Sequence, residues 1–163
     1  MKPTYTKASA GRHKIINKDS IKVIGIELKT TNENNQAVKD IPQFWEKFYV
    51  ENIKDRIPNK IDDEILGLYI DYEGDFTKPY SLIICCKVST FDEIPKGMVA
   101  KIIPAAKYVV FTAKGKMPGK LLETWQYVWN SDLDRTYTGD FEIYGQKFGN
   151  PEDSEVDVYI AVQ

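Results

Sequence analysis

The chain has 163 residues, of which 42% are hydrophobic and 28% charged, and its formal net charge is −2. This composition is typical of a single soluble globular domain, and the charge gives no support for a basic surface that binds nucleic acid. The longest apolar runs, such as LIICC, are too short to cross a bilayer, and no signal-peptide-like apolar segment follows the N-terminus. We therefore expect a cytoplasmic protein without membrane association.

The first half of the chain contains a strand, a helix and two further strands. Residues 1–20 are locally basic and lack periodicity, so we expect an N-terminal arm. Residues 21–28 alternate as a strand does. A helix is predicted over 40–53, with Asp40 as its N-cap. Two strands joined by the turn EGDFTKP are then expected at 64–72 and 80–88.

The second half repeats this order of elements. A strand is predicted at 106–115, a helix over 117–130, and strands at 141–146 and 156–162. Each helix carries an apolar stripe with tryptophan, which is typical of a helix packed on a core. We therefore predict one α+β domain at 21–163, built by tandem duplication, with repeat 1 at about 21–90 and repeat 2 at about 98–163. Its antiparallel sheets would be covered by helices on one side, leaving a groove between the repeats.

The stretch DFEIYG places one acid in an otherwise apolar strand. Strand alternation puts Phe141 and Ile143 on one face and Glu142 and Tyr144 on the other. If the helix covers Phe141 and Ile143, then Glu142 and Tyr144 face the groove. An isolated glutamate in a strand is commonly a solvent-facing residue, and that interpretation stands beside the first.

Further aromatic residues are candidates to line the same groove. They are Tyr69, Tyr108 and Tyr159 from the strands, with Trp45 and Trp125 from the helices. Aromatic faces attract cations by about 0.5–2 kcal/mol each, and a buried ionised carboxylate requires a cation or a proton. An aromatic groove with one acid therefore favours a hydrophobic, cationic small molecule.

No catalytic or metal motif emerges from the other reactive residues. The only histidine, His13, lies in the basic arm, so no Ser–His or Cys–His system can be assembled around it. No spaced His/Cys set of the kind that binds metal is present. Cys85 and Cys86 are adjacent in a predicted strand and point to opposite faces, which favours buried thiols over a disulfide. We predict no cofactor.

The order of these motifs resembles the GyrI-like (AraC-type) effector-binding domain of bacterial transcription regulators, over roughly residues 14–163. The motifs that carry the resemblance are IKVIGIEL, IPQFWEKF, GLYIDY, AAKYVVFTAKG, LLETWQYVWNSD, DFEIYG and EVDVYIAV. The resemblance implies the duplicated SHS2 fold. This sequence departs from the regulators to which such domains are fused, because it shows no helix-turn-helix or other DNA-binding segment, so we expect a stand-alone domain. The resemblance also implies that Glu142 is the charge partner of cationic, drug-like ligands in transcriptional regulation or multidrug response.

Two other functions remain open. Some stand-alone members of this family resemble hydrolases of small strained electrophiles, in which a pocket Glu acts with Tyr or Trp. Glu142 would then act as general base, and a groove tyrosine such as Tyr108 would orient the attacked carbonyl. The gyrase-inhibitor relatives imply instead a protein-interaction module. Its contact surface would be the acidic C-terminal face, made of Glu152, Asp153, Glu155 and Asp157. The ligand, a regulatory protein partner and the oligomeric state are not determined by the sequence.

Overall fold

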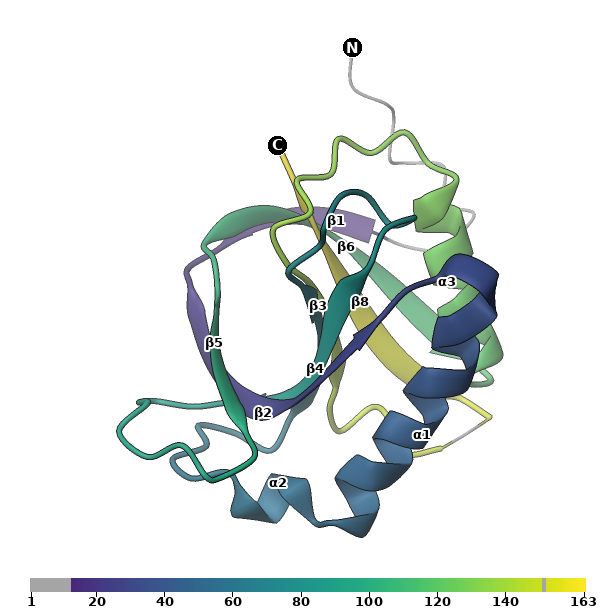
Figure 1. Ribbon diagram of the computed structural model, residues 1–163. Helices are drawn as coiled ribbons and strands as arrows, with labels where there is room; N and C mark the ends of the chain where they lie inside the picture. Colours follow the sequence, from purple (N-terminus) through teal and green to yellow (C-terminus); the bar gives the residue numbers. More distant parts are fainter. Residues whose placement is uncertain (1–12, 151) are drawn as a thin grey trace.

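The computed structural model describes residues 13–150 and 152–163, and within them eight strands form one antiparallel sheet of order β1-β6-β8-β7-β3-β4-β2-β5 (Figure 1). The strands are β1 (His13–Lys18), β2 (Ile21–Thr30), β3 (Ile65–Ile70), β4 (Tyr80–Lys87), β5 (Val99–Ile103), β6 (Ala106–Gly115), β7 (Asp140–Tyr144) and β8 (Ser154–Val162). The helices are α1 (Gln36–Val50), α2 (Ile53–Arg56) and α3 (Gly119–Trp129), with a 3-10 turn at Glu33–Asn35. None of these helices is long and apolar enough to span a membrane.

The predicted α+β duplication is confirmed. The first unit runs β1-β2-α1-α2-β3-β4 and the second β5-β6-α3-β7-β8, so each contains the expected strand–helix–strand–strand order. Each unit also begins with a strand that the sequence analysis missed. Part of the predicted arm is strand β1, which pairs with β6, while β5 pairs with β2. Residues 1–12 of that arm lie outside the described residues.

The two leading strands close the sheet on itself. β1 continues into β2, and β5 continues into β6. These two continuous segments pair in a single register that runs from His13↔Phe111 to Gly25↔Val99. The ladder has one short gap, between the last pair of β1 with β6, Lys18↔Ala106, and the first pair of β2 with β5, Ile21↔Ile103. Because β2 and β6 lie toward opposite ends of the strand order, this ribbon joins the two ends and curls the sheet (Figure 1).

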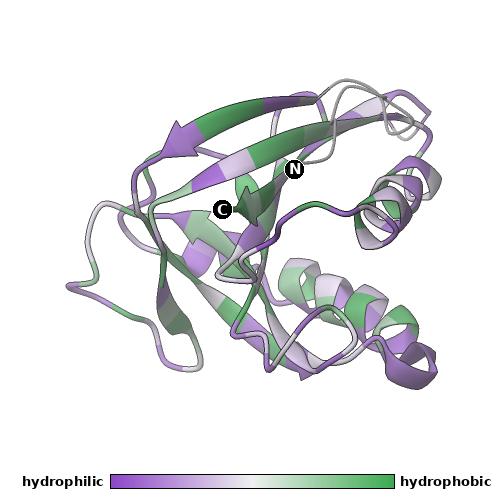
Figure 2. Ribbon diagram, turned by 90° about the horizontal axis from the view of Figure 1, so that it is seen from above, coloured by the Kyte–Doolittle hydropathy of each residue, from purple (hydrophilic) through white to green (hydrophobic). Residues whose placement is uncertain are grey.

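Closure gives the sheet an interior face and an exterior face, and both are buried along the central strands. The interior cluster includes Leu68, Tyr108 and Phe141. On the exterior, one cluster lies under α1 and α2 and a second lies under α3, and both long helices lie on the same side of the molecule (Figure 2). Cys85 belongs to the interior cluster and Cys86 to an exterior one, and both are free, which confirms their predicted separation.

The expectation that a helix covers Phe141 and Ile143 is wrong. Phe141 is buried in the interior cluster, and Ile143 packs against the same cluster. Glu142 and Tyr144, which alternate with them along β7, therefore point to the exterior face, where the helices lie. The physical reason is the closure, because a strand with two buried faces can place its apolar side chains inside the curl.

Helix α1 begins one turn earlier than predicted. It starts at Gln36, after Asn34 and Asn35 adopt left-handed backbone with φ of 52° and 58°, a conformation that asparagine tolerates better than most residues. Asp40 is therefore inside the helix rather than at its N-cap. Its carboxylate accepts hydrogen bonds from Thr30 Oγ1 at 2.9 Å and from Gln36 Nε2 at 3.0 Å.

We predict that Gly25→Ala strongly destabilises the fold. Gly25 pairs with β4 on one side and β5 on the other, and an added Cβ would lie 2.0 Å from the Ile84 carbonyl oxygen. Relief requires backbone movement, so the free energy of unfolding should fall by about 3 kcal/mol in urea denaturation. Gly119→Ala is the control, because a Cβ there meets no heavy atom within 4 Å. Equal stability of the two variants would contradict this close strand contact.

Candidate ligand-binding cavity

Glu142 lies at the centre of the closed sheet, where the two units meet. The β3–β7 pairing places it directly opposite Gly67, and only 1% of its surface is exposed. An added Cβ on Gly67 would lie 2.8 Å from Glu142 Oε1. The glycine therefore supplies the space that the carboxylate occupies.

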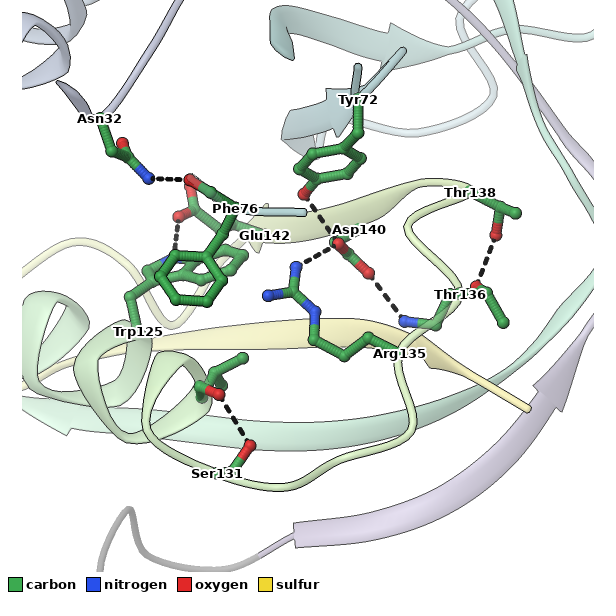
Figure 3. Close-up of polar contacts among 12 residues, drawn as sticks. Asn32, Tyr72, Phe76, Trp125, Ser131, Arg135, Thr136, Thr138, Asp140 and Glu142 are labelled. Atoms are coloured by element: carbon green, nitrogen blue, oxygen red, sulfur yellow. Dashed lines mark hydrogen bonds and ion pairs between the residues drawn. The ribbon is translucent and has the colours of Figure 1, made fainter. Parts of the chain in front are cut away.

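Three side-chain donors hold the Glu142 carboxylate. Trp125 Nε1 donates to Oε2 at 2.7 Å (Figure 3), and the Tyr69 hydroxyl donates to the same oxygen at 3.2 Å. The Tyr144 hydroxyl donates to Oε1 at 2.6 Å. Among residues 13–150 and 152–163, no lysine or arginine side chain forms an ion pair with it. The acid is thus oriented by neutral donors and has no cationic partner among these residues.

Burial and hydrogen bonding shift the pKa of Glu142 in opposite directions. Removal from water raises its pKa, while the bonds from Tyr144, Trp125 and Tyr69 lower it, and the balance lies above the value of an exposed glutamate. Burial and the Glu142 charge together raise the pKa of Tyr69 and of Tyr144 well above the usual tyrosine value. Both phenols therefore remain protonated donors at neutral pH.

The surroundings of Glu142 reflect the internal duplication. Tyr69 follows Gly67 by two residues on β3, as Tyr144 follows Glu142 on β7, so the two tyrosines occupy equivalent positions. Each packs edge-on against the tryptophan of one helix. The Tyr69–Trp125 ring centroids lie 5.1 Å apart at 68°, and the Tyr144–Trp45 centroids lie 4.9 Å apart at 70°. A near-twofold arrangement thus surrounds a single acid.

A cavity of about 340 Å³ lies over Glu142, between α1 and α3. Its volume is in the range of drug-sized ligand sites. The walls are mostly aliphatic and aromatic and come from both helices, the exterior face of the sheet and the adjoining loops. The lining residues are Asn32, Ala37, Val38, Ile41, Pro42, Tyr69, Tyr72, Phe76, Tyr80, Pro118, Leu121, Leu122, Trp125, Trp129, Arg135 and Glu142.

The rim of the cavity is apolar as well. Val38 on α1 and Leu122 on α3 both line it, yet their exposed fractions are 70% and 52%. Over the cavity, the Phe76 ring stacks on Trp129 at a centroid distance of 6.0 Å. The apolar lining therefore extends to solvent-exposed side chains on both helices.

A second buried acid near the cavity is already neutralised. Asp140 begins β7, and its Oδ2 accepts from the Tyr72 hydroxyl at 2.7 Å and from Arg135 Nη2 at 2.8 Å (Figure 3). Its Oδ1 accepts from the backbone N–H of Ala161 at 2.8 Å. Glu142 is therefore the only lining residue whose charge is uncompensated among the described residues. No group of His, Cys, Asp and Glu in this part of the chain is arranged to hold a metal ion.

The structure brings five of the seven predicted site residues together. Glu142, Tyr69 and Trp125 line the cavity. Tyr144 and Trp45 lie behind it, where Tyr144 holds the carboxylate and Trp45 packs against Tyr144.

The expectation that Tyr108 and Tyr159 line the groove is wrong. Both pack in the interior cluster on the opposite face of the sheet, where Phe141 stacks on Tyr159 at 4.6 Å. The groove was assigned to the face away from the helices, whereas the cavity lies on the face that the helices cover.

The sequence analysis also missed lining residues that lie in or beside two loops. Tyr72, Phe76 and Tyr80 flank or belong to the predicted turn EGDFTKP, and Arg135 belongs to the loop SDLDRTYTGD. The nine positions from 72 to 80 contain three aromatic residues in and beside a polar turn, and this clustering could have indicated that the turn contributes to a binding site. The position of Arg135 had no local signal, because its partner Asp140 is identified only by the tertiary structure.

The chain combines a duplicated α+β fold with a ligand-sized apolar cavity and one buried acid that has no cationic partner among the described residues, an architecture that suits an effector-binding domain. Residues 14–162 match the family described as "Cass2: Integron-associated effector binding protein", and the chain belongs to that family.

Comparisons with individual proteins agree with this assignment. YobU of Bacillus subtilis (strain 168), described as a candidate transcriptional regulator, is 31% identical over 148 residues, which cover 85% of this chain and 90% of YobU. The integron cassette protein VCH_CASS2 from the mobile metagenome of Vibrio cholerae has a TM-score of 0.73 at 32% identity, covering 93% of this chain and 95% of that one. SAV2435 bound to tetraphenylphosphonium has a TM-score of 0.78 at 22% identity, covering 93% and 94%.

We predict an energetic coupling between Gly67 and Glu142. Gly67→Ala should destabilise the wild-type protein by about 1–3 kcal/mol, because the added methyl meets Glu142 Oε1. In a Glu142→Ala background the obstacle is absent, so the same substitution should cost at least about 1 kcal/mol less. A double-mutant cycle from urea denaturation measures this difference. Additive effects would show that the glycine is not there to accommodate the carboxylate.

The raised pKa of Glu142 predicts a pH-dependent contribution to stability. Because the folded carboxyl keeps its proton to a higher pH than the unfolded one, its contribution is complete below the unfolded pKa and is lost as the pH rises through the folded pKa. The stability of Glu142→Gln relative to wild type should therefore increase between pH 4 and pH 7. Each unit by which the pKa is raised adds about 1.4 kcal/mol to this increase.

Denaturant titrations at several pH values provide the measurement, with Glu123→Gln on α3 as the control. The Glu123 side chain is 65% exposed and lies 3.4 Å from the Lys120 ammonium, so this variant reports what the loss of an exposed carboxylate contributes. A Glu142→Gln difference that is constant or shrinks with pH would contradict the raised pKa.

Proposed function

We propose that the protein binds a hydrophobic, cationic small molecule in the cavity between α1 and α3, with Glu142 as the charge partner. The observation that carries the proposal is that this acid is buried at the floor of an apolar cavity and has no cationic partner among the described residues. A buried ionised carboxylate is costly when it is unpaired. A lipophilic cation supplies both the missing charge and the apolar surface that the walls require.

The environment of the acid favours cation binding over proton transfer. Trp125, Tyr69 and Tyr144 occupy three of the roughly four lone-pair directions of the carboxylate and keep it oriented. Such preorganisation lowers the cost of ordering the site when a ligand binds. The rings of Trp125 and Tyr69 also line the cavity, where each can contribute an aromatic contact to a cation.

The related proteins support this class of ligand. The structure of SAV2435 that resembles this fold holds tetraphenylphosphonium, a hydrophobic cation. YobU is linked by its description to transcriptional regulation. On this basis, the protein serves as the effector-sensing part of a regulatory or multidrug response.

The structure gives less support to the two alternatives from the sequence. For the hydrolase mechanism, Tyr108 is not placed to orient a carbonyl beside Glu142, because it lies in the interior cluster and its hydroxyl donates to the Pro104 carbonyl at 3.3 Å. The tyrosines beside Glu142 are Tyr69 and Tyr144, and both hydroxyls already donate to its carboxylate. On the acidic C-terminal face of the protein-interaction alternative, Glu155 forms ion pairs at 3.5 Å with Lys114 and with Lys147, which reduces the negative charge that the face offers to a partner.

The proposal is tested by isothermal titration with tetraphenylphosphonium at neutral pH. Glu142→Gln keeps the shape of the side chain but removes its charge, so we expect the affinity to fall at least tenfold, which corresponds to about 1.4 kcal/mol. Glu123→Gln removes the same charge from the outer surface of α3 and should bind as wild type does. Undiminished binding by Glu142→Gln would exclude Glu142 as the charge partner.

A further inference from the structure

The two oxygens of the Glu142 carboxylate have different surroundings. Oε2 accepts from Trp125 Nε1 at 2.7 Å and from the Tyr69 hydroxyl at 3.2 Å, and both donors belong to residues that line the cavity. Oε1 accepts from the Tyr144 hydroxyl at 2.6 Å and lies 2.8 Å from the Cβ position of Gly67. Neither Tyr144 nor Gly67 is among the lining residues in the described part of the chain. The oxygen on the cavity side is therefore Oε2.

The oxygen on the cavity side has no acceptor position left. A carboxylate offers about four lone-pair positions, two on each oxygen, and Trp125 and Tyr69 occupy both positions of Oε2. The unused position belongs to Oε1, on the side of Tyr144. Only 1% of the Glu142 surface is exposed. Glu142 can thus act on a ligand through its charge, but it offers that ligand no acceptor for a hydrogen bond.

The other side-chain oxygens of the described lining belong to neutral groups that already have partners. Asn32 Oδ1 accepts from the Tyr80 hydroxyl at 2.8 Å, and Asn32 Nδ2 donates to the Phe76 carbonyl at 3.0 Å. The Tyr72 hydroxyl donates to Asp140 at 2.7 Å. Most of the remaining lining is aliphatic or aromatic. The cavity is therefore poor in free acceptors although it contains an acid.

This arrangement distinguishes two kinds of cation. A protonated amine carries N–H groups that leave water on binding and gain no bond to Glu142, and buried donors without acceptors are unfavourable. A quaternary ammonium or phosphonium ion has no N–H group to satisfy. It still gains the attraction of the carboxylate, because Coulomb attraction requires no shared hydrogen. It also gains contact with the rings of Trp125 and Tyr69.

We propose that the cavity selects cations that have no N–H group, such as quaternary ammonium and phosphonium ions, over protonated amines of equal charge and size. The inference rests on the proposed function, because Glu142 must attract the cation. Trp125 and Tyr69 determine this specificity. By donating to Oε2 they hold the negative charge in place and occupy the acceptor positions that an amine would need.

Isomeric cations test the selection, because isomers have the same charge and the same number of carbon atoms. Benzyltributylammonium is quaternary, whereas its isomer, the protonated form of benzyldihexylamine, keeps an N–H group at neutral pH. Isothermal titration of the wild-type protein should show about tenfold tighter binding of the quaternary ion, as expected when a buried N–H group lacks an acceptor. Tetrabutylammonium and protonated butyldihexylamine repeat the comparison without an aromatic ring and should give the same order.

Two matched variants separate hydrogen bonding from the shape of the ligands. Tyr69→Phe removes a donor from Oε2 and opens an acceptor position on the cavity side, so the preference for the quaternary ion should fall by about fivefold. Tyr144→Phe removes a donor from Oε1, whose neighbours do not line the cavity. It should therefore keep the wild-type ratio of the two affinities, even if both affinities change.

The failure of this inference is distinct from the failure of the proposed function. Equal wild-type affinities within each pair of isomers, or tighter binding of the amines, would overturn the selection and leave cation binding intact. So would a ratio that Tyr69→Phe leaves unchanged or that Tyr144→Phe lowers equally. The two wild-type comparisons decide the question even if a variant does not fold. If neither quaternary ammonium ion nor tetraphenylphosphonium binds, both proposals are overturned.

Discussion

The burial of an ionisable carboxylate without a cation is the constraint on which the rest of the site depends. Glu142 can occupy the middle of the sheet only because Gly67 faces it across β3 and leaves room for its oxygens. It can remain there only because Trp125, Tyr69 and Tyr144 supply donors from a helix and two strands. Burial of Glu142 therefore requires both the β3–β7 register, which places Gly67 opposite it, and the position of α3, which supplies Trp125.

Closure of the sheet makes this arrangement compatible with a stable core. The ribbon of β1–β2 with β5–β6 joins the ends of the sheet and creates an interior that is filled by side chains such as Phe141. The apolar side chains of β7 are buried in that interior. The opposite face is then free to carry an acid, and the helices that cover it become the walls of a cavity instead of a continuous core.

The duplicated fold is used asymmetrically. Tyr69 and Tyr144 come from equivalent strand positions and both donate to the same carboxylate, but Glu142 is opposite a glycine and not a second acid. Likewise Trp125 donates to the carboxylate, whereas Trp45 packs on Tyr144. Because only one of the two similar units contributes an acid, the cavity carries a single negative charge, which suits a ligand with a single positive charge.

The sequence by itself determined the strand–helix–strand–strand order within each unit, the duplication and the placement of Glu142 and Tyr144 on one face of their strand, because these follow from local periodicity. It also indicated Tyr69 and Trp125, since alternation and helical spacing place each relative to its neighbours. Only the tertiary structure decided which face the helices cover, because that depends on pairing β1 with β6 and β5 with β2 across 74 to 98 residues. As a result of that long-range closure, Tyr108 and Tyr159 lie in the interior, and the loop residues Phe76 and Arg135 lie at the cavity. Periodicity orders the two faces of a strand relative to each other, but what packs on each face is decided by contacts between distant segments.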